Sequence, residues 1–241
     1  MKKINAILYH LSCQIKYETI IFWSINSLVI IGFSLLALFV PSSIGFTITP
    51  SGAIYVLVAI VGSKWISRSL SYLLRLGVNR KQYAIGSILF TILYNAVHST
   101  IALIFFGLYH ILKIFELGST LYFLHPAHLL VSDLSAVPDT TPAYWQIFLT
   151  DFLLLNSLML ICMLFSIIFH RFGKLGGYTG IAILSFLFVV SIPFQWLFKL
   201  FDLVRNENFI ITGLYLLMTI FVLATIYIMS LRKISITSSQ K

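Results

Sequence analysis

Long apolar stretches without any charged residue dominate this sequence. Asp, Glu, Lys and Arg are absent from residues 19–40, 84–112, 178–198 and 210–231. A helix needs about 20 apolar residues to cross the hydrocarbon layer of a bilayer, and each of these stretches is that long. With 59% apolar and only 10% charged residues, the 241-residue chain lacks the polar surface of a water-soluble domain. The sequence therefore predicts an integral membrane protein.

We expect an all-α, polytopic membrane protein with a single domain over residues 1–241. Six spans are predicted, at residues 19–40, 52–66, 84–112, 147–169, 178–198 and 210–231. The second is the shortest, because Lys64 ends its apolar run, but a lysine can extend its ammonium group toward water.

Residues 3–17 precede the first predicted span. Ile4, Ile7, Leu8, Leu11 and Ile15 recur at helical spacing, which predicts an amphipathic helix lying on the membrane surface. A signal peptide is the alternative, but the run at 19–40 is longer than a signal core and no clean cleavage site follows it.

The charged residues divide between the two sides of this topology. With an inner amino terminus, most of the 16 Lys and Arg residues fall in cytoplasmic segments, whereas Lys113, Lys199 and Arg205 fall outside with most of the acids. Cytoplasmic loops of membrane proteins carry just such an excess of cations. We therefore expect a multi-pass protein of the cell membrane with both termini in the cytoplasm. Anionic lipid explains these clusters better than nucleic acid does.

Residues 64–83 carry five cations and no acid. Leucines between the cations give the segment one apolar and one basic helical face. Gly77 favours a left-handed helix end, and Asn79 followed by Gln82 has the spacing of a capping box. The segment thus predicts a helix that ends near Gly77 and another that begins at Asn79, both on the cytoplasmic side. The alternative is a basic loop that only fixes the topology.

Residues 76–86, Leu-Gly-Val-Asn-Arg-Lys-Gln-Tyr-Ala-Ile-Gly, resemble a segment of the permease subunits of bacterial ABC transporters of the type-2 exporter class. The layout is similar too, with about six spans and an interfacial amino-terminal helix. The resemblance implies a cytoplasmic coupling helix at residues 65–76, between spans 2 and 3, and a re-entrant helical pair at residues 193–209. It assigns contact with the ATPase to Leu70, Leu73, Leu74, Arg75, Gly77, Asn79, Arg80 and Lys81.

This resemblance implies the membrane subunit of an ATP-driven exporter. Its partners would be an ABC ATP-binding subunit, which uses ATP and Mg²⁺, and a second permease chain, either identical or a paralogue. The chain itself is expected to be no enzyme and to hold no cofactor. Gly173-Lys174 is not a phosphate loop, because Ile168 stands where the preceding glycine would be and no Ser or Thr follows the lysine.

Polar residues inside the predicted spans form a candidate substrate path. They are Asn26, Asn95, His98, Asn156 and Gln195. Polar groups in hydrocarbon need partners, so we expect these side chains to face the bundle interior, where hydrogen bonding between helices is the simpler role for each one singly. The scarcity of charge in the spans favours an apolar or amphipathic substrate, such as a peptide, a lantibiotic-like molecule, a drug or a lipid.

Two further groups of polar residues are weak candidates for a site. His125 and His128 with Asp133, in the outer loop at residues 116–145, lack a third close ligand, so a loop or membrane-interface role is favoured over a metal site. Asp151 lies near the outer end of the fourth span, and nothing else in the sequence supports a proton relay there.

Two alternative functions stay open. A polytopic membrane enzyme would need paired carboxylates, a His/Asp cluster or a Ser/Lys dyad at membrane depth, and the sequence pattern reveals none. An immunity or structural membrane protein that transports nothing would differ from a permease by lacking a bound ATPase.

Overall fold

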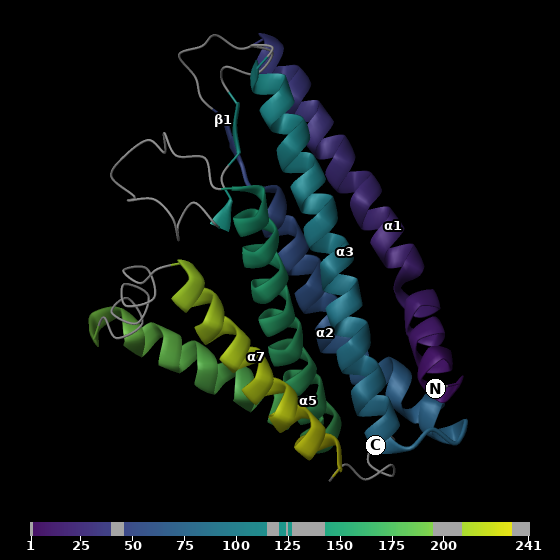
Figure 1. Ribbon diagram of the computed structural model, residues 1–241. Helices are drawn as coiled ribbons and strands as arrows, with labels where there is room; N and C mark the ends of the chain where they lie inside the picture. The colour runs from purple at the N-terminus through teal and green to yellow at the C-terminus, as the bar shows by residue number, and fades with distance from the viewer. Residues whose placement is uncertain are drawn as a thin grey trace.

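The computed structural model describes residues 2–39, 46–114, 121–123, 125–126, 143–194 and 209–232. The described helices are α1 (Lys2–Phe39), α2 (Pro50–Arg75), α3 (Arg80–Ile114), α5 (Tyr144–Phe194) and α7 (Phe209–Arg232). Two short strands, β1 (Phe46–Ile48) and β2 (Leu121–Phe123), pair in parallel. The helices form an elongated bundle, with β1 at the end opposite to the termini (Figure 1).

Five described helices are long and apolar enough to cross a membrane. They are Lys3–Leu36, Ser51–Arg75, Arg80–Ile111, Tyr144–Gly173 and Phe209–Arg232. This confirms the helical membrane-protein character that the sequence predicts. The predicted span at 178–198 falls on the last part of α5 as far as Phe194. Most of the predicted re-entrant pair at 193–209 lies outside the described residues.

Helix α1 differs from the prediction of a surface helix at 3–17 followed by a span at 19–40. It is one helix from Lys2 to Phe39, because no Gly or Pro interrupts the chain near residue 18. The apolar stripe formed by Ile7, Leu11 and Ile15 is buried in the core of the protein. Ile7 reaches Gly86 of α3, where a side chain would collide with it. The stripe therefore packs against protein.

Helix α2 also joins two predicted elements. The predicted span at 52–66 and the predicted coupling helix at 65–76 are consecutive turns of one helix that ends at Arg75. Its last turns are held by the core, since Trp65, Leu70 and Leu73 are all buried. The prediction of a separate helix at residues 65–76 is thus corrected: residues 65–75 are the last turns of α2.

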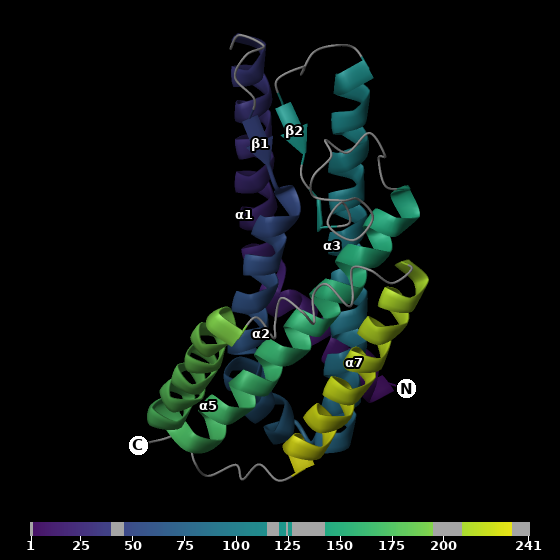
Figure 2. The same ribbon diagram turned by 90° about the vertical axis from the view of Figure 1, so that its left-hand side faces the viewer.

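Helix α5 is the centre of the bundle and contacts α2, α3 and α7. Gly173 interrupts it with a positive φ of 69°, a conformation that glycine adopts most readily. The part of α5 after Gly173 takes a different direction from the part before it (Figure 2). The predicted separation of residues 147–169 from residues 178–198 therefore corresponds to this break.

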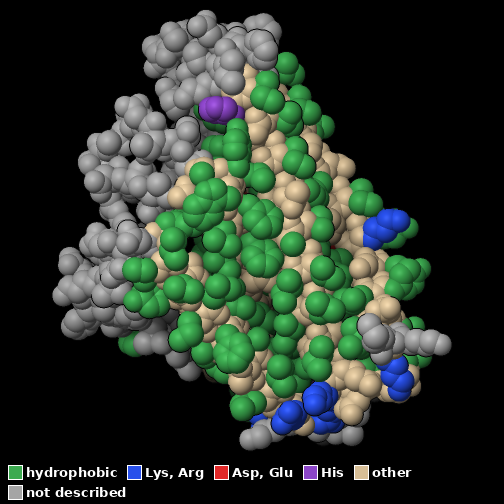
Figure 3. Space-filling view, in the orientation of Figure 1, with side chains coloured by type: hydrophobic (Ala, Val, Ile, Leu, Met, Phe, Trp, Pro, Cys, Tyr) green, Lys and Arg blue, Asp and Glu red, His purple; other side chains and the backbone are tan. Residues whose placement is uncertain are grey.

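Basic side chains gather toward one end of the molecule, the end at which both termini lie (Figure 3). Hydrophobic side chains cover the flank of the bundle between the two ends. Two buried hydrogen bonds between hydroxyl groups stabilise the bundle, one between Ser69 and Tyr83 at 2.7 Å and one between Ser87 and Tyr227 at 3.0 Å. They connect α2 to α3 and α3 to α7.

A close approach of α2 to α5 at Gly62 generates a stability prediction. A Cβ at Gly62 would lie 2.8 Å from Cβ of Cys162 and 3.1 Å from the backbone oxygen of Met159. Gly62→Ala should therefore lower the free energy of unfolding by about 1–3 kcal/mol, measured by SDS titration in mixed micelles. The matched control is Gly32→Ala, because a Cβ at Gly32 meets no atom within 4 Å. Equal effects of the two variants would contradict this packing.

Candidate functional site

A carboxylate is buried between α2 and α5. Asp151 of α5 is only 1% exposed. The Tyr55 hydroxyl donates to its Oδ1 at 2.7 Å, and the Ser51 hydroxyl donates to its Oδ2 at 3.3 Å. His125 Nε2 lies 2.8 Å from the same Oδ2. A carboxylate only accepts hydrogen bonds when ionised, so three donors converge on it. We call Ser51, Tyr55, His125 and Asp151 the Asp151 cluster.

Local structure explains how these residues meet. Ser51 and Tyr55 are four residues apart on α2 and therefore share one helical face. His125 follows β2 by two residues, and β2 pairs with β1, which leads directly into α2. The strand pair thus brings the segment that carries His125 beside the start of α2. Asp151 projects from the third turn of α5.

The Asp151 cluster lies beside the uncharged part of α2. At 1.5 Å per residue, Ser51 is about 20 Å along α2 from Lys64. Lys64 is the first cation of α2, so it marks the boundary of the helix's uncharged part. A hydrocarbon layer is about 30 Å thick, so this part of α2 is short enough to fit within one. A buried carboxylate beside such an apolar segment is a candidate functional group.

The chemistry of the cluster is that of a hydrogen-bonding and proton-holding site. A His/Asp pair with a Tyr and a Ser can accept a proton or bind a polar group of a ligand. The part of the chain that the structure describes holds no group of three or more His, Cys, Asp or Glu residues that could bind a metal. His128 and Asp133 lie outside the described residues.

Sequence reasoning missed this constellation. His125 was expected in a loop or at the membrane interface, but it is 4% exposed and paired with Asp151. The sequence pattern reveals no His/Asp cluster, whereas the structure brings His125 and Asp151 together. The two residues are 26 positions apart, so no periodicity connects them. The available signal was Asp151 itself, a lone carboxylate in an otherwise uncharged apolar run.

The predicted coupling residues lie in the last turns of α2, in the first turn of α3 and in the turn that joins them. Gly77 has a φ of 78°. Its N–H donates to Leu74 O at 3.0 Å and the Val78 N–H donates to Leu73 O at 3.1 Å, which is the Schellman pattern of a helix end. Asn79 then caps α3: its N–H donates to Gln82 Oε1 at 3.1 Å. The predicted left-handed stop and capping box are confirmed.

Two long-range hydrogen bonds tie this turn to both ends of the chain. Lys3 Nζ of α1 donates to Gly77 O at 3.2 Å. Arg80 donates to the backbone oxygen of Arg232, the last residue of α7, at 3.0 Å. We call the surface formed by Arg75, Leu76, Arg80, Lys81 and Arg232 the basic end. Because α1, α2, α3 and α7 all meet there, a force applied to the turn reaches four helices.

The burial of the predicted coupling residues is uneven. Leu70 and Leu73 are each 3% exposed and belong to the core, and Leu74 packs partly against it. The expectation that these leucines point toward a partner or the bilayer is therefore corrected for Leu70 and Leu73. Arg75, Asn79 and Lys81 are exposed. Leu76, which was not predicted as a contact, is 63% exposed.

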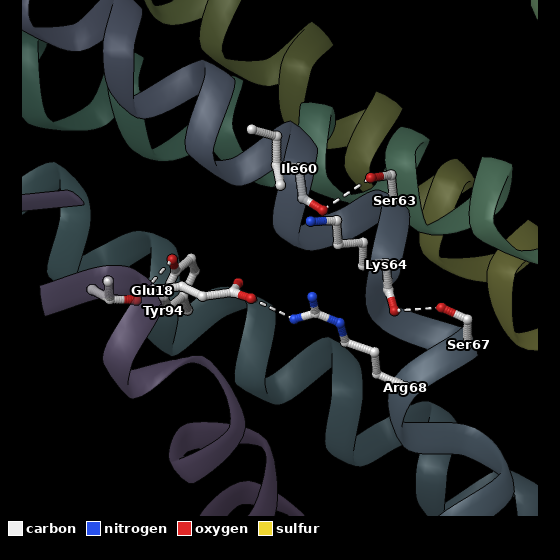
Figure 4. Close-up of polar contacts among 8 residues, drawn as sticks. Glu18, Ile60, Ser63, Lys64, Ser67, Arg68 and Tyr94 are labelled. Atoms are coloured by element: carbon white, nitrogen blue, oxygen red, sulfur yellow. Dashed lines mark hydrogen bonds and ion pairs between the residues drawn. The ribbon is translucent and has the colours of Figure 1, made fainter. Parts of the chain in front are cut away.

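An ion pair lies between α1 and α2. Glu18 of α1 pairs with Arg68 of α2, and Lys64 extends from the same helix as Arg68 (Figure 4). Next to this pair, Thr19 and Tyr94 share a hydrogen bond at 3.3 Å. Each partner of the ion pair is more than a third exposed, so its contribution to stability is small, about 0–1 kcal/mol.

The predicted substrate-path residues are buried but separate. Asn26, Asn95, His98 and Asn156 are 8%, 0%, 1% and 2% exposed, which agrees with inward-facing side chains. Asn156 donates to Phe152 O within its own helix, at 2.6 Å. Within the described residues no hydrogen bond joins one of these four side chains to another. Gln195 lies outside the described residues.

Comparison with protein-family models, curated proteins and solved structures finds no match to this chain. Its function is therefore argued from its own geometry.

The Asp151 cluster predicts a measurable coupling. Tyr55→Phe removes one donor to the carboxylate and should lower the free energy of unfolding by about 1.5–3 kcal/mol. In an Asp151→Asn background, Tyr55→Phe should lower the free energy of unfolding by clearly less, because the carboxylate that accepts from Tyr55 has been replaced. Tyr215→Phe is the matched control, since Tyr215 of α7 is 49% exposed. Strictly additive effects in this double-mutant cycle would show that the two side chains do not interact.

Proposed function

We propose that this chain is the membrane-spanning subunit of an ATP-driven exporter, working with a separate ATP-binding subunit. The observation that carries the proposal is the basic end, where one rigid turn joins α2 to α3 and is hydrogen-bonded to α1 and α7. Such a turn can pass the movement of a soluble partner to the spans better than a flexible loop can.

The chemistry of the basic end suits an acidic, partly apolar protein surface. Arg75 and Lys81 are exposed on either side of Leu76, which offers an apolar side chain among cations. Complementary charge steers association, and a central apolar residue supplies contact area. The contact residues in this proposal are Arg75, Leu76, Arg80 and Lys81. Leu70 and Leu73 anchor the turn from inside.

The path of the chain supports a sixth span and cytoplasmic termini. Helix α5 reaches the basic end by Gly173, and α7 ends there at Arg232, beside Arg80. The chain between them must therefore return to the opposite end before α7 begins. The second part of α5 begins that return, in agreement with a span at 178–198. Cations at the basic end favour the cytoplasmic side.

The proposal includes a second permease chain, identical or a paralogue, and two ATPase subunits that bind ATP and Mg²⁺. In the apolar membrane-crossing segments of α1 and α7, only 6% of the residues are buried. These helices thus leave broad apolar faces for lipid or for a second chain. The cargo in this proposal is apolar or amphipathic, because the described spans contain one buried carboxylate and no buried lysine or arginine.

The Asp151 cluster favours a second candidate, a polytopic membrane enzyme. A His/Asp pair with a neighbouring hydroxyl is the kind of group that such an enzyme requires. This candidate predicts activity in the purified chain without any ATPase. It also predicts that His125→Gln abolishes this activity, whereas Leu76→Asp at the basic end leaves the activity unchanged.

Variants of the basic end test the proposed function. Leu76→Asp introduces an acid into a basic surface and should abolish copurification of the ATPase, together with ATP hydrolysis stimulated by an amphipathic peptide in liposomes. The chain itself should insert normally, because Leu76 is exposed. The matched control is Tyr144→Asp at the opposite end, where Tyr144 is 51% exposed, and it should keep the ATPase bound.

Three results would contradict the proposal. The first is that no ATPase copurifies with the wild-type chain from its native membrane. The second is that Leu76→Asp binds the ATPase as well as the wild-type chain does. The third is that Tyr144→Asp loses the ATPase to the same extent. Leu73→Asp serves as the reference for general unfolding, since Leu73 is buried.

A further inference from the structure

An open groove of about 580 Å³ runs between α1 and α3. Its size falls within the range of about 300–1,000 Å³ that is usual for small-molecule sites. Apolar side chains form most of its walls, among them Ile20, Leu93 and Val97, which are 51%, 51% and 56% exposed. We call it the α1–α3 groove. Because its walls lie on the flank of two spans, it opens toward lipid.

The α1–α3 groove has one cation in its lining. Lys16 lies part-way along the α1 wall, between Cys13 and Thr19, and none of the lining residues is an acid. Lys16 makes no ion pair with any residue that the structure describes. The nearest acid in sequence, Glu18, is paired with Arg68 on the side of α1 that faces α2. Lys16 therefore suits an acidic head group.

The groove also contains a buried acceptor. His98 is 1% exposed and lines the groove. Its Nδ1 lies 2.9 Å from Tyr94 O, and a carbonyl oxygen can only accept, so Nδ1 carries the proton. In the neutral ring Nε2 is then an acceptor, and it has no hydrogen-bond partner. Such an atom needs an O–H or N–H donor.

The spacing of the two polar groups defines the ligand. Thr19 bonds to Tyr94, and Trp23 lies beside His98 with 5.7 Å between ring centroids. His98 is thus level with Trp23, two helical turns beyond Lys16. At 1.5 Å per residue the separation along the helix axis is about 10 Å. An unsubstituted lipid chain has no donor at that depth.

We propose that the α1–α3 groove binds an anionic single-chain amphiphile that carries a hydrogen-bond donor within its apolar part. The acidic head group pairs with Lys16 at the basic side of the membrane. The chain lies along the apolar walls, and its donor bonds to His98 Nε2. Binding of this ligand needs neither an ATPase nor the Asp151 cluster, so it stands apart from the proposed function.

Cys13 supplies a natural reporter, because it lines the groove and is exposed. The full chain with Cys162→Ser is placed in phosphatidylcholine nanodiscs, and the rate at which Cys13 reacts with a maleimide is measured. Two probes are compared: 10-hydroxystearate, which carries a hydroxyl midway along its chain, and stearate, which lacks it. Both should slow the reaction saturably. Half-protection should need about fivefold less 10-hydroxystearate, the effect of one hydrogen bond.

Two variants separate the contributions. His98→Leu should remove the difference between the probes while stearate still protects Cys13. Lys16→Gln should weaken both probes by a similar factor. The matched control thiol is Tyr17→Cys in a chain with Cys13→Ser and Cys162→Ser, since Tyr17 is 75% exposed on the same helix and does not line the groove. Its reaction rate should be unchanged by either probe.

The inference is overturned if wild-type protection is the same for both probes, or if the fivefold difference persists in His98→Leu. Equal slowing at the control thiol would show that the probes only enter the bilayer, and this too would overturn it. Protection by a neutral amphipathic peptide with neither fatty acid effective would assign the groove to a different class of ligand.

Discussion

The hydrocarbon layer imposes the constraint on which this structure depends: every polar group within it must be bonded or moved to an end. The chain meets it in two ways. Its cations lie mostly toward one end, where the α2–α3 turn is tied to Lys3 and to Arg232. Asp151, the one buried carboxylate among the described residues, is surrounded by donors from α2 and from the segment after β2. The two arrangements give the bundle chemically different ends.

Local signals predicted the fold where the physical cause is local. The apolar runs located the long apolar helices, five of which could cross a membrane. Gly77, Asn79 and Gln82 located the α2–α3 turn to the residue, because helix caps depend on neighbouring residues only. The boundary proposed between residues 17 and 19 was not found. There an amphipathic stripe packs on Gly86 of α3, and amphipathic character alone does not distinguish a membrane surface from a protein surface.

The site was harder to predict because it depends on contacts between distant residues. His125 reaches Asp151 only through the pairing of β1 with β2, and neither three-residue strand has a recognisable pattern. The leucines of the basic segment illustrate the same difficulty. Leu70, Leu73 and Leu76 all lie among cations, a pattern typical of a helix that docks on a partner. Leu70 and Leu73 nevertheless fill the core, and only Leu76 is exposed. Which face a partner can reach follows from packing that a single sequence does not display.

The central claim is that the basic end faces the cytoplasm and contacts a soluble ATPase there. Photocross-linking in living cells tests both parts together, with benzoylphenylalanine placed at Leu76 in one variant and at Tyr144 of the opposite end in the other. The account predicts that the probe at position 76 attaches to a protein that mass spectrometry identifies as an ATP-binding subunit, and that the probe at position 144 does not. An ATPase captured from position 144, or captured from neither position, would contradict the account.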